Sequence, residues 1–162
     1  MRAVATCLLL LLTLPACDEV SDAVDNAACQ ASGYADSGSV RATVDGDAFS
    51  GTCVRVDARA GTLTVLGADN VVSQNSQEFI SVTFPTTEIR SYTLGDGLAV
   101  ASFTARTEDT DDQGEEVYAA TGGTVRLDVA TETSAQGTFS FTAQNASGET
   151  VEVEGGRFSV TF

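Results

Sequence analysis

Apolar and polar residues alternate along short stretches of the chain from residue 39 to the C-terminus, and this pattern restricts the possible folds most strongly. Within residues 39–45, the apolar Val40, Ala42 and Val44 alternate with polar residues. Successive side chains of a β-strand point to opposite faces, so a period of two predicts strands with one buried face. Turn-forming residues separate these stretches roughly every 8–12 residues. We therefore expect an all-β domain over residues 39–162, an antiparallel sandwich or barrel of about nine to ten short strands.

Local turn signals place three connections within this domain. Residues 45–47, Asp-Gly-Asp, have the chemistry of a turn. Residues 59–61, Arg-Ala-Gly, lie between two alternating stretches and predict a tight hairpin. Near the C-terminus, a diglycine at 155–156 separates two further stretches, so we expect Glu154 and Arg157 to face each other across a hairpin.

The first 16 residues have the layout of a secretory signal peptide. Arg2 supplies a positive charge, residues 3–14 are apolar apart from two threonines, and the small Ala16 precedes Cys17. About 20 apolar residues are needed to span a bilayer, so this run is short for a permanent transmembrane helix. We expect residues 1–16 to be removed on export.

The end of this segment, Leu14-Pro15-Ala16-Cys17, resembles the lipobox of bacterial lipoproteins. The resemblance implies that the Cys17 thiol takes a diacylglycerol, that the chain is cut before it, and that the new amine is acylated by a chain such as palmitate. Acyl chains contribute about 0.8 kcal/mol per buried CH₂, so more than one chain makes a stable membrane anchor. An ordinary signal peptide cut nearby, with Cys17 as a free or paired thiol, is the alternative.

Residues 17–38 mix acidic, small and flexible residues with little periodicity, which is typical of a flexible tether. Asp18 directly after Cys17 resembles an inner-membrane retention signal of enteric bacteria. The acidic pair 18–19 instead resembles a signal for export to the cell surface in other groups. We expect a lipid-anchored protein of the bacterial cell envelope, at the periplasmic face or cell surface of the outer membrane in preference to the inner membrane.

The cysteines predict one crosslink. Of the four, Cys7 lies in the signal peptide and Cys17 becomes a thioether, which leaves Cys29 and Cys53 to pair in an oxidising compartment. Cys53 alternates with Val54 and the apolar residues that follow it, so it lies on the opposite face of its strand. We therefore expect a disulfide that fastens the tether to the outside of a sheet. Two reduced thiols are the alternative.

The charge balance excludes several classes of function. Asp and Glu total 23 against 8 basic residues, all of them arginine, and the formal net charge is −15. This acidity argues against binding to nucleic acid and against charge-driven docking on anionic lipid. The chain has no His and no Lys, so it lacks an imidazole base, a Ser-His-Asp arrangement and a Schiff-base amine. Paired carboxylates cannot be assigned among so many acids. We expect a protein that is not an enzyme and needs no cofactor.

Residues 108–116 predict an acidic loop with some features of a calcium site. Side-chain oxygens recur here at alternate positions, on Asp109, Asp111, Gln113 and Glu115. Calcium takes oxygen ligands at such spacing, and Gly114 would allow the sharp turn that a calcium loop needs. The position of the closing glutamate of a helix-flanked calcium loop falls on Ala120, and the flanks read as strands. A solvated hairpin loop is therefore the alternative to a calcium site.

Residues 118–160 resemble a family of uncharacterised bacterial lipoproteins of unknown function. The matching pattern is a Gly-Thr that opens a strand, then Gly-Thr-Phe-Ser-Phe at 137–141, then a glycine-led last strand. The resemblance implies the fold and the anchoring, and it carries no activity. We expect a non-catalytic envelope protein that presents its β domain for binding or structural contact, with an unknown protein or glycan partner. A calcium-dependent adhesion or matrix module that uses residues 109–116 is the alternative.

Overall fold

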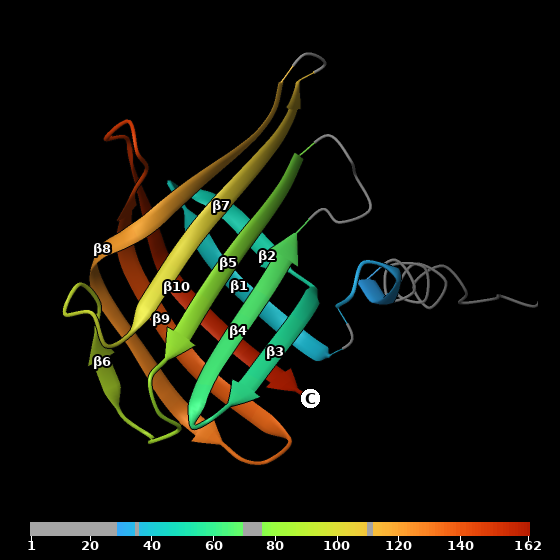
Figure 1. The fold of residues 1–162 in the computed structure, drawn as a ribbon, viewed down its shortest axis with the longest axis vertical. Coiled ribbons are helices and arrows are strands. Elements are labelled where there is room, and N and C mark those ends of the chain that lie inside the picture. The colour runs from blue at the N-terminus through green and yellow to red at the C-terminus, as the bar shows by residue number, and fades with distance from the viewer. Residues whose placement is uncertain (1–28, 35, 70–75, 110–111) are drawn as a thin grey trace, which may run out of the picture.

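The computed structural model describes residues 29–34, 36–69, 76–109 and 112–162, and it confirms an all-β fold (Figure 1). Ten antiparallel strands form a nearly closed barrel, so of the two predicted architectures the barrel is the one adopted. The strands are β1 (Ser37–Val44), β2 (Asp47–Gly51), β3 (Cys53–Arg59), β4 (Thr62–Asp69), β5 (Ser76–Phe84), β6 (Ser91–Thr93), β7 (Val100–Asp109), β8 (Asp112–Ala130), β9 (Ser134–Gln144) and β10 (Thr150–Thr161).

The strand order explains how the sheet closes. The order is β2-β1-β10-β9-β8-β7-β5-β4-β3, with β6 paired to β8 outside this path. Only Thr52 separates β2 from β3, so the chain passes directly from one end of the sheet to the other. Asp36, just before β1, forms an antiparallel bridge to Val54 of β3 beside this seam. Closure of this kind removes the open edges that an isolated sheet would expose.

Inward-facing side chains fill the barrel. Most of the alternating apolar residues predicted on one face of the strands are buried, including Val40 and Val44 of β1, Phe49 of β2 and Phe103 of β7. A barrel of about eight strands has an interior just wide enough for side chains. The largest fully buried side chains are Phe84, Leu63, Ile80, Leu127, Val40, Val54, Val65, Val82, Val125 and Val153.

Glycines on inward positions make room for large neighbours. A Cβ atom on Gly156 of β10 would collide with the ring of Phe139 on β9, and one on Gly67 of β4 would collide with Val40 of β1. The second pair lies across the seam, where β1 approaches β4. A small residue beside a large one lets the inward-facing side chains of these strands pack together at native density.

Two predicted turns are confirmed. Asp45 and Gly46 connect β1 to β2 with φ angles of 48° and 93°, and Ala60 and Gly61 connect β3 to β4 with 51° and 85°. Positive φ at both central residues characterises the two-residue turns that match the twist of a hairpin.

The predicted hairpin at residues 155–156 is wrong. β10 runs through the diglycine as one strand, and its register against β9 shifts between Val153 and Gly156. Glu154 and Arg157 therefore lie on the same strand, opposite Thr43 and Arg41 of β1 respectively. Glycine suits a bulge as well as a turn, because both require backbone conformations that other residues adopt at a cost.

Candidate functional site

A disulfide fastens the chain before β1 to the outside of the barrel. Cys29 and Cys53 are bonded, with their Cα atoms 5.1 Å apart. Together with Ala68 they form a small apolar cluster separate from the barrel core, and Tyr34 and Phe79 pack against it. The pairing is as predicted from the cysteine count, and its position on the outer face of the sheet is as predicted from the alternation around Cys53. We call residues 29–34 together with Asp36 the N-terminal segment.

Asp36 holds the other end of the N-terminal segment. Its backbone amide donates to the Val54 carbonyl oxygen at 3.3 Å, and its carboxylate Oδ2 accepts from the Val56 amide at 2.6 Å. Within the segment, the Tyr34 amide donates to the Cys29 carbonyl oxygen at 2.9 Å. The disulfide and Asp36 both attach to β3, so the segment is held at both ends against the barrel wall.

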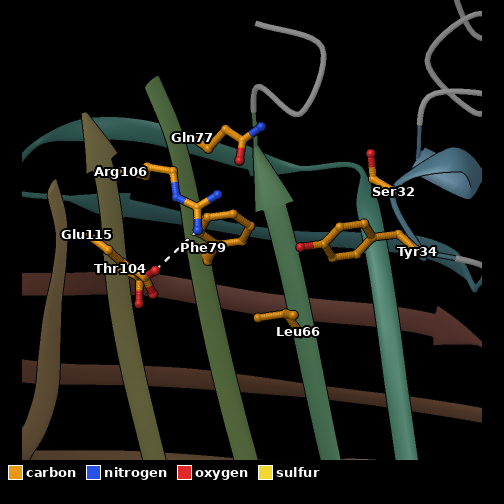
Figure 2. Close-up of a pocket in the computed structure, with 8 residues that line it drawn as sticks. All are labelled: Ser32, Tyr34, Leu66, Gln77, Phe79, Thr104, Arg106 and Glu115. Carbon is orange, nitrogen blue, oxygen red and sulfur yellow. Dashed lines mark hydrogen bonds and ion pairs between the residues drawn. The ribbon is translucent and has the colours of Figure 1, made fainter. Parts of the chain in front are cut away.

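The N-terminal segment forms one side of a groove of about 510 Å³ on the outer face of β4, β5 and β7 (Figure 2). Its lining residues are Ser32, Tyr34, Leu66, Gln77, Phe79, Thr104, Arg106 and Glu115. Leu66 and Phe79 are half-buried outward-facing residues that provide apolar surface, and Tyr34 lies on the side of the segment. Arg106 and Glu115 occupy the opposite side, on β7 and β8.

The charged side of the groove is an ion pair across two strands. Arg106 Nη2 donates to Glu115 Oε2 at 3.2 Å, and the two residues are register partners in the β7–β8 pairing. Both side chains are about half exposed to solvent. The guanidinium keeps donors that this single contact does not use, because an arginine offers five N–H groups.

Tyr34 provides a neutral hydroxyl at the other side. Burial raises the pKa of the Tyr34 hydroxyl above its ordinary value, against the opposing effect of the Arg106 and Arg55 charges. The phenol is therefore protonated at neutral pH and acts as a hydrogen-bond donor or acceptor. The groove thus combines apolar surface, a phenol and an ion pair, which is an arrangement suited to binding.

The alternation pattern of β4 and β5 contains a signal for this groove. Leu66 and Phe79 are large apolar residues on the polar face of their strands, next to the buried Val65 and Ile80. An outward apolar residue on each of two adjacent strands indicates a surface covered by something else. The sequence could not show that the N-terminal segment lies beside both.

A family model described as a domain of unknown function (DUF6252) matches residues 36–160. The chain belongs to this family. No curated protein and no solved structure matches the chain. The DUF6252 range begins at Asp36, the residue that bridges to β3, and includes nearly all of the barrel. Cys29, Ser32 and Tyr34 precede that range, so one side of the groove comes from residues outside the DUF6252 match.

The interval 108–116 of the DUF6252 domain belongs to a β-hairpin, in agreement with the hairpin alternative, but most of it is strand, so the predicted loop is wrong. β7 extends to Asp109 and β8 starts at Asp112, with Asp109 opposite Asp112 and Glu108 opposite Gln113. In this hairpin, Glu115 is paired with Arg106.

The calcium site proposed for this interval stays a prediction. Asp111, one of its four expected ligands, lies outside the described residues. Among the residues that the structure describes, no group of three or more acidic or cysteine side chains is placed to hold a metal ion.

The anchor predicted at Cys17 also lies outside the described residues, as do the signal peptide at 1–16 and most of the 17–38 tether. The first strand begins at Ser37, close to the predicted start of the β domain. Within the described ranges, no helix combines the length and the hydropathy needed to cross a bilayer.

Proposed function

We propose that this protein is a lipid-anchored component of the bacterial cell envelope that binds a ligand, without catalysis, in the groove beside its N-terminal segment. The observation that carries the proposal is that one side of the groove is fastened to the barrel by the Cys29–Cys53 disulfide. Because the N-terminal segment is held at both ends, it loses little conformational entropy when a ligand binds, and such preorganisation favours affinity.

The groove favours an amphipathic ligand. Leu66 and Phe79 would contact an apolar or aromatic part, and Arg106 and Tyr34 would contact a polar or anionic group. Glu115 balances the Arg106 charge when no ligand is bound. A catalytic role finds no support among the lining residues, because the phenol is protonated at neutral pH and the carboxylate is already ion-paired.

The position of the groove fits an anchored protein. Twelve residue steps separate Cys17 from Cys29. Even a fully extended chain would therefore keep Cys29 within about 43 Å of an acylated Cys17. A ligand at or near the membrane surface would then be within reach of the site.

The binding proposal is tested with 8-anilinonaphthalene-1-sulfonate, which carries an aromatic part and an anionic group. We expect its fluorescence titration to weaken about 3- to 10-fold for Leu66→Gln, because buried apolar contact is lost. Leu98→Gln is the matched control, since Leu98 is 62% exposed and lies outside the groove. Equal affinities for both variants would refute binding in the groove.

The anchoring proposal is tested separately. We expect mass spectrometry of the native protein to find Cys17 as the acylated first residue. Cys17→Ser is expected to move the protein from the membrane fraction to the soluble fraction of the envelope. An unmodified Cys17 thiol, or a retained leucine-rich segment, would contradict the anchor and leave the groove result unaffected.

A further inference from the structure

Three arginines lie in one row across the outer face of the barrel, on the wall formed by β1, β10, β9 and β8. Arg41 of β1 is the register partner of Arg157 of β10, which is opposite Thr138 of β9. Thr138 is in turn opposite Arg126 of β8. We call these four residues the arginine row. All three arginines are exposed, and each has at least one chain neighbour that is buried in the barrel interior.

Arg41 and Arg157 lack acidic partners although the chain is rich in carboxylates. Among the described residues, neither forms an ion pair, whereas Arg126 is paired with Asp128 at 2.5 Å. Directly opposed residues of an antiparallel pair have Cα atoms about 5 Å apart, and like charges in that position destabilise the sheet. A pair of unmatched positive charges is thus held together on a protein with a net charge of −15.

Mostly hydroxyl and amide side chains surround these two arginines, together with the Asp128 carboxylate, which is paired with Arg126. Two shallow depressions of about 360 and 470 Å³ meet on this wall and share Thr138 and Arg157. The polar uncharged side chains that line them are those of Ser39, Thr124, Gln136, Thr138, Ser140 and Ser159. The aromatic residues at their base, Phe139 and Phe158, are buried, so no ring is presented for stacking.

We propose that the arginine row binds an anionic polysaccharide. Guanidinium groups form bidentate, charge-assisted hydrogen bonds to carboxylate or sulfate groups, and the neighbouring hydroxyl and amide side chains are suited to sugar hydroxyls. The row extends about 14 Å from Arg41 to Arg126 at the usual spacing of strands, enough for several contacts along one glycan chain. The lack of a stacking platform disfavours single-stranded nucleic acid, whose bases require one.

This surface is independent of the groove. The groove lies over β4, β5 and β7, whereas the arginine row crosses β1, β10, β9 and β8. In the view of Figure 1, β1, β10 and β9 lie behind β4, β5 and β7. The two share no lining residue. A protein anchored near the membrane could therefore hold a ligand on one wall and an envelope glycan on the other.

The test compares binding of the full chain to polygalacturonate, dextran sulfate, polyphosphate and neutral dextran. We expect binding to the two anionic polysaccharides and none to neutral dextran. The double variant Arg41→Gln, Arg157→Gln is expected to lose about 10- to 100-fold in affinity, the range for charge-assisted hydrogen bonds. The control Arg55→Gln, Arg59→Gln removes the same charge from β3 and is expected to bind within about twofold of the unmodified chain.

Three outcomes would overturn the proposal: no binding to either anionic polysaccharide, equal losses in the two double variants, or stronger binding to polyphosphate than to both glycans. Thermal unfolding provides the check on folding. Removing opposed like charges is expected to leave the melting temperature of the Arg41, Arg157 double variant unchanged or higher. A fall in its melting temperature would show that the two arginines stabilise the fold through partners of their own, and it would also overturn the proposal.

Discussion

Cys53 and Val54 are adjacent in the sequence and point to opposite sides of the barrel wall. Val54 is fully buried in the core, whereas Cys53 belongs to the outer cluster with Cys29. The same strand therefore contributes to the barrel interior through one residue and holds the side of the groove through the next. Stability of the barrel and integrity of the groove are therefore linked at this position.

Removing the disulfide is expected to affect both the stability of the barrel and binding in the groove. The double variant Cys29→Ser, Cys53→Ser opens a loop with a sequence separation of 24 residues. The chain-entropy model predicts a loss of about 3 kcal/mol in the free energy of unfolding, measured by urea denaturation. We also expect weaker binding of 8-anilinonaphthalene-1-sulfonate under conditions where the variant is folded. Unchanged stability on reduction of the unmodified protein would argue that the bond does not form.

Gly156 is expected to resist substitution. A Cβ atom there would lie 2.6 Å from the Phe139 carbonyl oxygen and even closer to the Phe139 ring. Gly156→Ala should therefore lower the free energy of unfolding by about 1–3 kcal/mol through overpacking. Gly122→Ala is the matched control, because a Cβ atom on Gly122 meets nothing within 4 Å and its φ is not positive. Similar losses in the two variants would contradict the packing described at Phe139.

Ala60 is expected to be a site for stabilisation. It lies in the β3–β4 turn with a φ of 51°, a left-handed conformation that alanine adopts at a cost. Ala60→Asn should raise the free energy of unfolding by about 0.5–1 kcal/mol, because asparagine tolerates this region and favours such turns. Ala58→Asn, at an exposed position near the end of β3, introduces the same side chain in an extended conformation and should not stabilise. Chemical denaturation measures the free energy of unfolding of both variants, and no gain for Ala60→Asn over Ala58→Asn would contradict this expectation.

Glu78 is expected to make stability depend on pH. Burial, followed by the charges of Asp69 and Asp47, raises the pKa of the Glu78 carboxyl, and Asp69 lies directly opposite Glu78 in the β4–β5 register. The folded state thus holds the Glu78 proton more tightly than the unfolded chain does. Its stabilising contribution is present below the ordinary pKa of glutamate and is lost as pH rises through the raised value.

Glu78→Gln should therefore be more stable than the unmodified protein at about pH 7 and equal to it at about pH 3, where the carboxyl is protonated in both states. Glu132→Gln removes the same charge from an exposed turn and controls for the net charge of the chain. Melting temperatures across this range give the comparison. A gain that is the same at both pH values would show that Glu78 ionisation is not its cause.

The elements that local rules specify were predictable from the sequence. A period of two requires only that one face of a strand meets apolar surroundings, so the inward positions of Val40, Ile80 and Phe103 could be assigned without knowing their neighbours. The turn at 60–61 follows from residues next to each other. The Cys29–Cys53 pair followed from counting the cysteines that remain when Cys7 and Cys17 are assigned to the predicted signal peptide and anchor.

Sequence reasoning failed where one residue type serves two local structures. The diglycine at 155–156 has the chemistry of a turn, yet β10 continues through it as a bulge because its backbone pairs with β9 on both sides of the diglycine. The acidic interval 108–116 is hydrophilic like a loop, yet it extends β7 and β8 because their backbones pair up to Asp109 and Asp112. In each case the neighbouring strand determines the structure.

The sequence by itself determined which residues point inward, where the chain reverses at tight turns, and which cysteines pair, because these depend on contacts along the chain or on elimination. Only the tertiary structure decided that the sheet closes into a barrel, that Tyr34 and Arg106 line one groove, and that Arg41 and Arg157 stand side by side. The physical reason is register: the pairing of distant strands decides which outward side chains become neighbours, and no local pattern encodes that pairing.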